Sequence, residues 1–300
     1  MARRLSDKRY AWITRAALTS LVIIVITGAA VRLTGSGLGC SDWPRCNDEK
    51  FVDVSSFHGA IEQLNRLFTG VVTVLVMASV LAARFLVERR RDLERLAWLL
   101  VLGVIGQIVL GGVVVLTDLN PVANQGHFLL SMFLVATGLI LVKKASGRET
   151  SIATTVRIRR LVRLVAALAG TAIVTGTVVT GAGPHAGDEK APRLDVAITT
   201  AARIHGIAVF ATLVAIVVLL VAIRRSSFGT LHSAIEVLLV LGVLQATVGY
   251  VQYFNDIPAA LVGIHIALAT AFFLAIVNLW WVAGRSRNQI EAERAAIVSR

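Results

Sequence analysis

One pattern occurs twice in this chain, as QIVLGGVVVLTDLNPVANQGH over residues 107–127 and as QATVGYVQYFNDIPAALVGIH over residues 245–265. In each copy a glutamine lies within an apolar run, and a histidine 20 residues later begins the next apolar run. Gly111 and Gly249 stand at matching positions in the two copies. Polar groups repeated at fixed positions of a helix pair indicate that the chain consists of two similar halves.

The composition indicates a protein that crosses a membrane several times. Of the 300 residues 56% are hydrophobic and only 16% are charged, and the mean hydropathy is +0.76. A helix needs about 20 apolar residues to cross a bilayer core of about 30 Å. The sequence therefore predicts an all-α membrane protein with eight transmembrane helices arranged as two pseudo-symmetric four-helix bundles. The expected spans are residues 11–33, 59–83, 96–117, 124–142, 162–182, 199–223, 233–252 and 260–283.

The two predicted halves are residues 1–150 and 151–300, with four spans each. A second correspondence between them lies further upstream. The helix that begins with Glu62-Gln63-Leu64-Asn65-Arg66 matches in order the helix that begins with Ala202-Arg203-Ile204-His205-Gly206. Each half thus has polar groups near the start of its second and its fourth helix.

The net charge of +12 follows a membrane topology and does not indicate nucleic-acid binding. Most of the 30 lysines and arginines fall in residues 3–15, 84–95, 143–163, 224–225 and 285–300, which are the two ends and alternate loops. Basic loops stay on the cytoplasmic side of a bilayer and contact anionic lipids. The charge pattern therefore predicts a multi-pass protein of the cell membrane with both termini in the cytoplasm.

The only two cysteines, Cys40 and Cys46, lie in the first outer loop. The predicted topology places this loop on the oxidising side of the membrane, where disulfides persist. A disulfide between them is therefore expected. Two interpretations of the pair remain open, a staple of the loop and a redox pair.

The second span begins with a polar cluster. Glu62 and Asn65 are three residues apart and Glu62 and Arg66 are four apart, so all three lie on about one face of the helix. A carboxylate in a membrane is costly unless it is paired or hydrated. We therefore consider two possibilities, a functional carboxylate that faces an interior cavity and a Glu62–Arg66 pair at the interface. His58 lies one turn earlier, at the interface, and is a further candidate ligand.

Three histidines, His127, His205 and His265, lie at similar depth near the outer ends of their spans. In a four-helix bundle, two imidazoles from facing helices can hold a heme iron, with one ring nitrogen on the metal and the other on a hydrogen-bond partner. His205 and His265 are such a pair within the second half. Zinc or copper would suit the same ligands, but small residues and apolar walls favour a large flat macrocycle.

At this point the chain resembles the heme A synthase family, membrane enzymes that convert heme O to heme A for cytochrome oxidase, and its cysteine spacing is similar to that of the actinobacterial type. The resemblance covers nearly the whole chain. The residues that carry it are Arg32-Leu33-Thr34-Gly35-Ser36-Gly37-Leu38, Cys40-Ser41-Asp42-Trp43-Pro44-Arg45-Cys46, Glu62 with Asn65-Arg66, His127, Gly181-Ala182-Gly183-Pro184-His185-Ala186-Gly187-Asp188, His205 and His265.

The resemblance implies a resident heme b in the second half, with His205 and His265 as its axial ligands. It implies that the first half binds the substrate heme O through His127, with Glu62 as the essential carboxylate. The family's other substrate-heme ligand is a histidine three residues after that carboxylate, and here this position is Asn65. Hence either the iron of the substrate is five-coordinate on His127, or His58 or Glu62 contributes a ligand.

The implied reaction is oxidation of the C8 methyl group of heme O to a formyl group by two hydroxylations and loss of water, which would make the chain an oxidoreductase. Electrons have to come from a donor, and heme O synthase and a second copy of the chain are further candidate partners. Arg32, Arg66 and Arg203 are candidates for contacts with heme propionates, although long basic side chains also reach lipid head groups.

Two other functions are considered. A diheme cytochrome-b-like electron carrier of the membrane would need the same histidines without turnover of a substrate. An inverted-repeat transporter fits less well, because halves of four spans have the same orientation and the polar groups lie near the outer surface.

Overall fold

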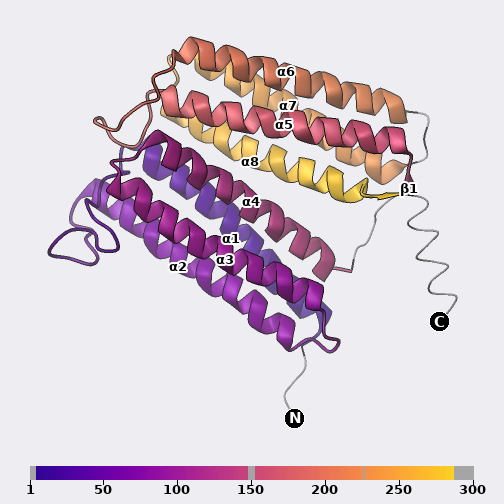
Figure 1. The fold of residues 1–300 in the computed structure, drawn as a ribbon, viewed down its shortest axis with the longest axis horizontal. Helices are drawn as coiled ribbons and strands as arrows, with labels where there is room; N and C mark the ends of the chain where they lie inside the picture. The colour runs from indigo at the N-terminus through magenta and orange to yellow at the C-terminus, as the bar shows by residue number, and fades with distance from the viewer. Residues whose placement is uncertain (1–4, 148–152, 225, 227, 287–300) are drawn as a thin grey trace.

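The computed structural model describes residues 5–147, 153–224, 226 and 228–286, and in this part of the chain eight helices make up the fold (Figure 1). All eight are long and apolar enough to cross a membrane, so the protein is a multi-pass membrane protein. The helices are α1 (Asp7–Leu33), α2 (Phe57–Arg84), α3 (Arg91–Leu116), α4 (Pro121–Ala145), α5 (Val156–Ala182), α6 (Ile198–Ile223), α7 (Gly229–Phe254) and α8 (Ala259–Val282). Two short strands, β1 (Ala153–Thr154) and β2 (Arg285–Ser286), pair in parallel.

Several helices begin earlier than the hydropathy of the sequence predicted. Helix α5 starts at Val156 rather than at residue 162, because the hydroxyl of Thr155 accepts a hydrogen bond from the backbone N–H of Ile158. Helix α4 starts at Pro121, where the Asn120 side chain accepts from two backbone N–H groups. The first turn of α5 is basic and α4 begins with a proline, so the hydropathy pattern did not include these turns although their backbone is helical.

The eight helices form two four-helix bundles, as predicted. In the first bundle, α1 and α3 each pack against α2 and α4, so α2 and α4 are diagonally opposite. The same order in the second bundle places α6 diagonally opposite α8. One cluster of buried side chains lies among α1–α4 and a second among α5–α8. The predicted boundary at residues 150 and 151 falls outside the described residues.

The two hairpins α3–α4 and α7–α8 show the repeat in their backbones. Asp118 and Leu119 both have positive φ values of 51° and 63°, and Asp256 and Ile257 have φ values of 56° each. The backbone N–H of Leu119 donates to the carbonyl of Val114 at 2.8 Å, and that of Ile257 donates to Gln252 at 2.9 Å. The two turns therefore have the same backbone conformation. Of the two residues with positive φ in each turn, only the first, an aspartate, is the same in both.

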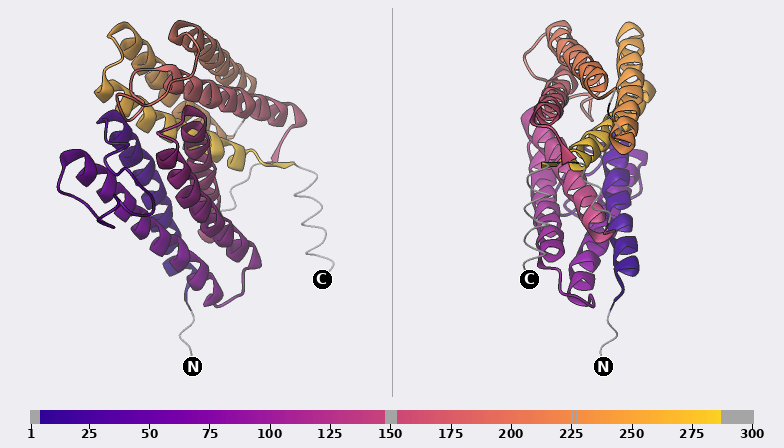
Figure 2. Two further views of the ribbon diagram at one scale, coloured as in Figure 1. Left: turned by 60° about the vertical axis from the view of Figure 1, so that its left-hand side comes forward. Right: turned by 90° about the vertical axis from the view of Figure 1, so that its right-hand side faces the viewer.

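The bundles meet through α1, α4, α5 and α8, and their axes are inclined to each other (Figures 1 and 2). Polar contacts join them at one end, which carries residues 34–56 and 183–197 and which we call the loop end. Here the guanidinium of Arg32 donates to the carbonyl of Thr180 at 2.8 Å, and the N–H of Gly37 donates to the carbonyl of Gly187 at 2.8 Å. These bonds fix the two halves relative to each other close to the histidines.

Candidate functional site

His205 of α6 and His265 of α8 come together across the second bundle. Their ring centres are 6.4 Å apart, and the ring planes are inclined by 75°. Nδ1 of His205 donates to the carbonyl of Ala172 at 3.0 Å, so Nε2 keeps the lone pair that can bind a metal. His265 lacks an equivalent bond, because its Nδ1 is buried without a hydrogen-bond partner among the described residues.

A glycine on the preceding helix makes room for each of these rings. A Cβ atom at Gly176 of α5 would lie 3.1 Å from Cε1 of His205, and one at Gly249 of α7 would lie 3.1 Å from Cε1 of His265. Such contacts are tighter than most side chains adopt, so any larger residue would displace the ring. Each glycine therefore determines how closely the imidazole ring packs against the preceding helix.

The His205–His265 pair fits a heme iron. Two imidazoles that share one metal at bond lengths of about 2 Å have ring centres roughly 6 Å apart, close to the separation found here. Within the described residues no group of three or more His, Cys, Asp or Glu side chains gathers as a metal site. The donor set thus suits a metal that brings its remaining ligands in a macrocycle, as heme does.

His127 of α4 occupies the matching place in the first bundle. A Cβ atom at Gly111 of α3 would lie 3.3 Å from Cε1 of His127. The corresponding distance from a Cβ atom at Gly249 to Cε1 of His265 is 3.1 Å. The amide of Gln107 donates to the backbone carbonyl of His127 at 3.0 Å and to Ser131 at 2.7 Å, which ties α3 to α4 at this level. Nδ1 of His127 is buried without a hydrogen-bond partner among the described residues.

Asn65 of α2 lies where His205 lies in the second half. Its Nδ2 is 3.9 Å from the place of a Cβ atom on Gly28, and its Oδ1 accepts a hydrogen bond from Thr27 at 2.8 Å. In the second half, Thr175 and Gly176 make the equivalent approach to His205, with the Thr175 hydroxyl 3.3 Å from Nδ1. The Thr-Gly pairs at 27–28 and 175–176 are the sequence signal from which these equivalent contacts could have been predicted.

Glu62 is buried and its two carboxylate oxygens have different partners. Oε2 accepts the backbone N–H of Cys40 at 2.7 Å, and Oε1 accepts from the guanidinium of Arg66, with Nε at 3.0 Å. Of the two possibilities considered for this carboxylate, the pair with Arg66 is present, and the carboxylate is buried. In this arrangement it fastens the cysteine loop to α2.

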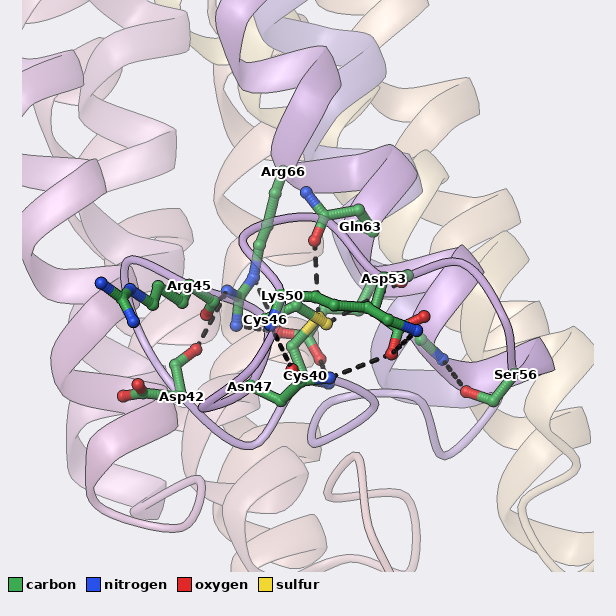
Figure 3. Close-up of a disulfide and its surroundings, with 12 residues drawn as sticks. Cys40, Asp42, Arg45, Cys46, Asn47, Lys50, Asp53, Ser56, Gln63 and Arg66 are labelled. Carbon is green, nitrogen blue, oxygen red and sulfur yellow. Dashed lines mark hydrogen bonds and ion pairs between the residues drawn. A yellow bond between two sulfur atoms is a disulfide. The ribbon is translucent and has the colours of Figure 1, made fainter.

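The predicted disulfide joins Cys40 to Cys46 and is confirmed in the structure (Figure 3). Both cysteines are buried. Arg66 reaches from α2 to the loop and donates to the carbonyls of Asp42 and Arg45, each at 3.1 Å. Trp43 covers Gly112 of α3, where a Cβ atom would be 2.8 Å from the indole ring. The loop is therefore held over the loop end of the first bundle by α2 and α3 together.

Asp53 stabilises the far side of the same loop. It accepts hydrogen bonds from the backbone N–H of Ser55 at 3.0 Å and from the amide of Asn47 at 2.9 Å. Hydrogen bonds from Ser55 are the main cause that lowers the pKa of Asp53 to about 2, so the carboxylate stays ionised at neutral pH.

The remaining predicted site residues have other surroundings. Nδ1 of His58 is hydrogen-bonded to Ser36 at 2.9 Å, and Nε2 of His185 donates to the carbonyl of Ile257 at 2.7 Å. Arg203 is exposed at the start of α6. His58 and His185 thus connect loops at the loop end, and Arg32 lies at the contact between the bundles.

We predict that Glu62→Ala loosens the cysteine loop. A hydrogen bond to a charged group contributes about 1.5–3 kcal/mol, and each 1.4 kcal/mol corresponds to about ten-fold in rate. The disulfide should therefore be reduced by dithiothreitol at least about ten-fold faster, measured by alkylation of the released thiols and mass spectrometry. Glu49→Ala, an exposed change in the same loop, is the control; equal rates for the two variants would contradict this role of Glu62.

Known proteins are similar to parts of this chain. A family model described as "Cytochrome oxidase assembly protein" matches residues 10–55, which include α1 and the disulfide loop. The Heme A synthase of Geobacillus thermodenitrificans is 32% identical over 135 residues, or 44% of this chain and 42% of that protein. The Heme A synthase of Bacillus pumilus is 33% identical over 137 residues, or 44% of each chain.

The alignments therefore span less than half of the length of these relatives. A third, the Heme A synthase of Exiguobacterium sibiricum, gives the same result, with 31% identity over 134 residues and 45% of that protein covered. The matches confirm the resemblance found in the sequence: part of the chain is similar to the heme A synthases.

Proposed function

We propose that this protein is a heme A synthase, an oxidoreductase that converts the C8 methyl group of heme O to a formyl group and so supplies heme A for cytochrome oxidase. The observation that carries the proposal is the His205–His265 pair, whose rings stand 6.4 Å apart on diagonal helices. The relatives named Heme A synthase support the reaction class.

In this proposal the second half, residues 151–300, holds a resident heme b. His205 and His265 bind its iron, the carbonyl of Ala172 keeps the proton of His205 on Nδ1, and Gly176 and Gly249 leave space for the rings. Bound there, the heme supplies reversible one-electron transfer. The residues around it contribute orientation and an apolar environment.

The first half, residues 1–150, is proposed to bind the substrate heme O. His127 is its iron ligand, and Asn65 occupies the place of a second ligand across the bundle. The substrate lies near the loop end, because Asn65 and His127 lie within the first turns of α2 and α4. Oxidation of a methyl group to a formyl group removes four electrons from the substrate, so the reaction needs an oxidant. With dioxygen as that oxidant, each of the two hydroxylations also takes two electrons from a donor, which reduce the second oxygen atom to water.

Glu62 is proposed to act on the reacting methyl group. It lies one turn before Asn65 on α2 and is buried at 5% exposure. An ionised carboxylate has about four lone-pair sites that accept hydrogen bonds, and the bonds from Cys40 and Arg66 occupy three of them, which leaves one. Loss of the charge should therefore affect the reaction even where the loop remains in place.

The other partners and the orientation belong to the same proposal. Arg32 and Arg203 are the candidates for heme propionates, because Arg66 is engaged by the loop. The distribution of basic residues favours a plasma-membrane protein with both termini in the cytoplasm and the disulfide loop outside. Heme O synthase as the source of substrate, and a second copy of the chain, remain candidate partners.

Extraction of hemes from the purified protein tests the proposed reaction. Expressed in a host that makes heme O and no heme A, the protein should contain heme b together with heme A or its hydroxylated intermediate, identified by chromatography and mass. Heme b alone, with supplied heme O unchanged under reducing and aerobic conditions, would instead support the diheme electron carrier.

The proposed role of Glu62 predicts that Glu62→Gln lowers formation of heme A by about 100-fold or more, since a positioned proton-transfer group contributes about that much. The amide keeps an acceptor for the backbone N–H of Cys40, so the heme b content and the disulfide reduction rate should stay near those of the unmodified protein. Normal production of heme A in this variant would remove the catalytic assignment.

Gly176→Val should displace His205 and weaken retention of heme b by roughly ten-fold or more, because overpacking costs about 1–3 kcal/mol. Gly170→Val on the same helix is the control, because a Cβ atom there meets nothing within 4 Å. The readout is heme per polypeptide from the pyridine hemochrome spectrum. Equal heme content in both variants would argue against heme ligation by His205.

A further inference from the structure

Asn65 and His205 occupy equivalent positions, but the two side chains offer different chemistry. Each stands over a glycine of the preceding helix, Gly28 or Gly176, next to a threonine that hydrogen-bonds to it. Imidazole has a lone pair on Nε2 for a metal. The nitrogen of a carboxamide carries two hydrogens and has no lone pair to offer, so only its oxygen could bind a metal.

Thr27 determines which end of the Asn65 amide is free. Its hydroxyl lies 2.8 Å from Oδ1 of Asn65 and 3.4 Å from the carbonyl of Ile24, so the shorter bond goes to Asn65. This bond uses one of the two lone pairs of Oδ1 and fixes the orientation of the amide, so that Nδ2 keeps its two donor hydrogens and lies 3.9 Å from the place of a Cβ atom on Gly28. The side chain is therefore oriented as a hydrogen-bond donor.

The other candidate ligands of this half are engaged elsewhere. Nδ1 of His58 bonds to Ser36, and both oxygens of Glu62 are bound by Cys40 and Arg66. His127 differs from them, because its Nδ1 is buried without a hydrogen-bond partner among the described residues. His58 is moreover exposed in the first turn of α2, seven residues before Asn65, so His127, whose ring lies over Gly111, is the imidazole of the first half placed to bind an iron there.

The position of Asn65 relative to His127 follows from the repeat. His127 stands over Gly111 as His265 stands over Gly249, and α2 and α4 are diagonal as α6 and α8 are. In the second half this arrangement brings the two side chains together across the bundle, with ring centres 6.4 Å apart. The same arrangement in the first half directs Asn65 toward His127.

We propose that Thr27 fixes Asn65 as a hydrogen-bond donor opposite His127, so that a heme in the first half has one protein ligand and an open axial position facing a polar N–H. This rests on the proposed binding of heme by both halves. The two sites are thereby distinguished: the second half holds its iron with two imidazoles and excludes small ligands, and the first half admits them and stabilises bound anions.

Spectroscopy of the ferric protein loaded with two hemes tests the open position. We expect one low-spin and one high-spin component in electron paramagnetic resonance, and His127→Ala should remove the high-spin component. Cyanide should convert the high-spin component to low-spin and leave the other unchanged. Asn65→His should make the first site low-spin and weaken cyanide binding at least ten-fold, and His205→Asn, the matched change in the second half, should create a new high-spin heme.

Fluoride tests the donor, because this anion accepts hydrogen bonds. Asn65→Leu should keep cyanide binding and weaken fluoride binding, and Thr27→Val should weaken it by about three- to ten-fold, the contribution of one hydrogen bond. Thr27→Ser keeps the hydroxyl, so this variant should bind fluoride as tightly as the unmodified protein. Equal fluoride affinity in the unmodified protein and Asn65→Leu would overturn the donor role.

The proposal is overturned if the heme of the first half is low-spin and inert to cyanide, or if only one heme binds when heme is supplied in excess. Its failure is distinguishable from failure of the proposed function. A high-spin, cyanide-binding site in a protein that leaves heme O unchanged would support the inference and exclude the synthase. Production of heme A by a protein with two low-spin hemes would support the synthase and overturn the inference.

Discussion

The close approach of a polar side chain to a glycine on the preceding helix is the contact on which the rest of the structure depends. It occurs in all four helix hairpins, at Gly28–Asn65, Gly111–His127, Gly176–His205 and Gly249–His265. In a membrane, helices associate by van der Waals packing and interhelical hydrogen bonds, and small residues permit the closest contact. These glycines allow the two helices of each hairpin to pack closely. They therefore also determine where in the bundle the polar side chain lies.

The repeat gives the protein two sites of similar shape, and a few residues make them chemically different. In the second half the ring of His205 is oriented by the Ala172 carbonyl, and in the first half the amide of Asn65 is oriented by Thr27. The cysteine loop covers only the first half, where Glu62 and Arg66 fasten it. The proposed site for retaining a cofactor and the proposed site for transforming a substrate can thus share one scaffold, because the differences lie in single side chains and one loop.

The loop end carries most of the polar contacts that join distant parts of the chain. Arg32 bonds to Thr180 between the bundles, His185 bonds to Ile257 within the second, and Glu62 bonds to the loop of the first. Buried polar groups need partners, and the irregular backbone of the loops supplies free carbonyl and N–H groups that helices do not. This explains why Arg32, Glu62 and Arg66, which lie within the spans, have their partners at this end.

The sequence by itself determined the eight helices, the two-fold repeat, the disulfide and the pairing of His205 with His265. The length of apolar runs, the position of basic loops and the spacing of residues can be read along the sequence. They do not depend on how each helix is rotated about its own axis. Only the tertiary structure decided that Glu62 bonds to Cys40, that His58 bonds to Ser36 and that Thr27 holds Asn65. These contacts join helices and loops whose rotation and side-chain rotamers are set by packing, so spacing along one chain cannot predict them.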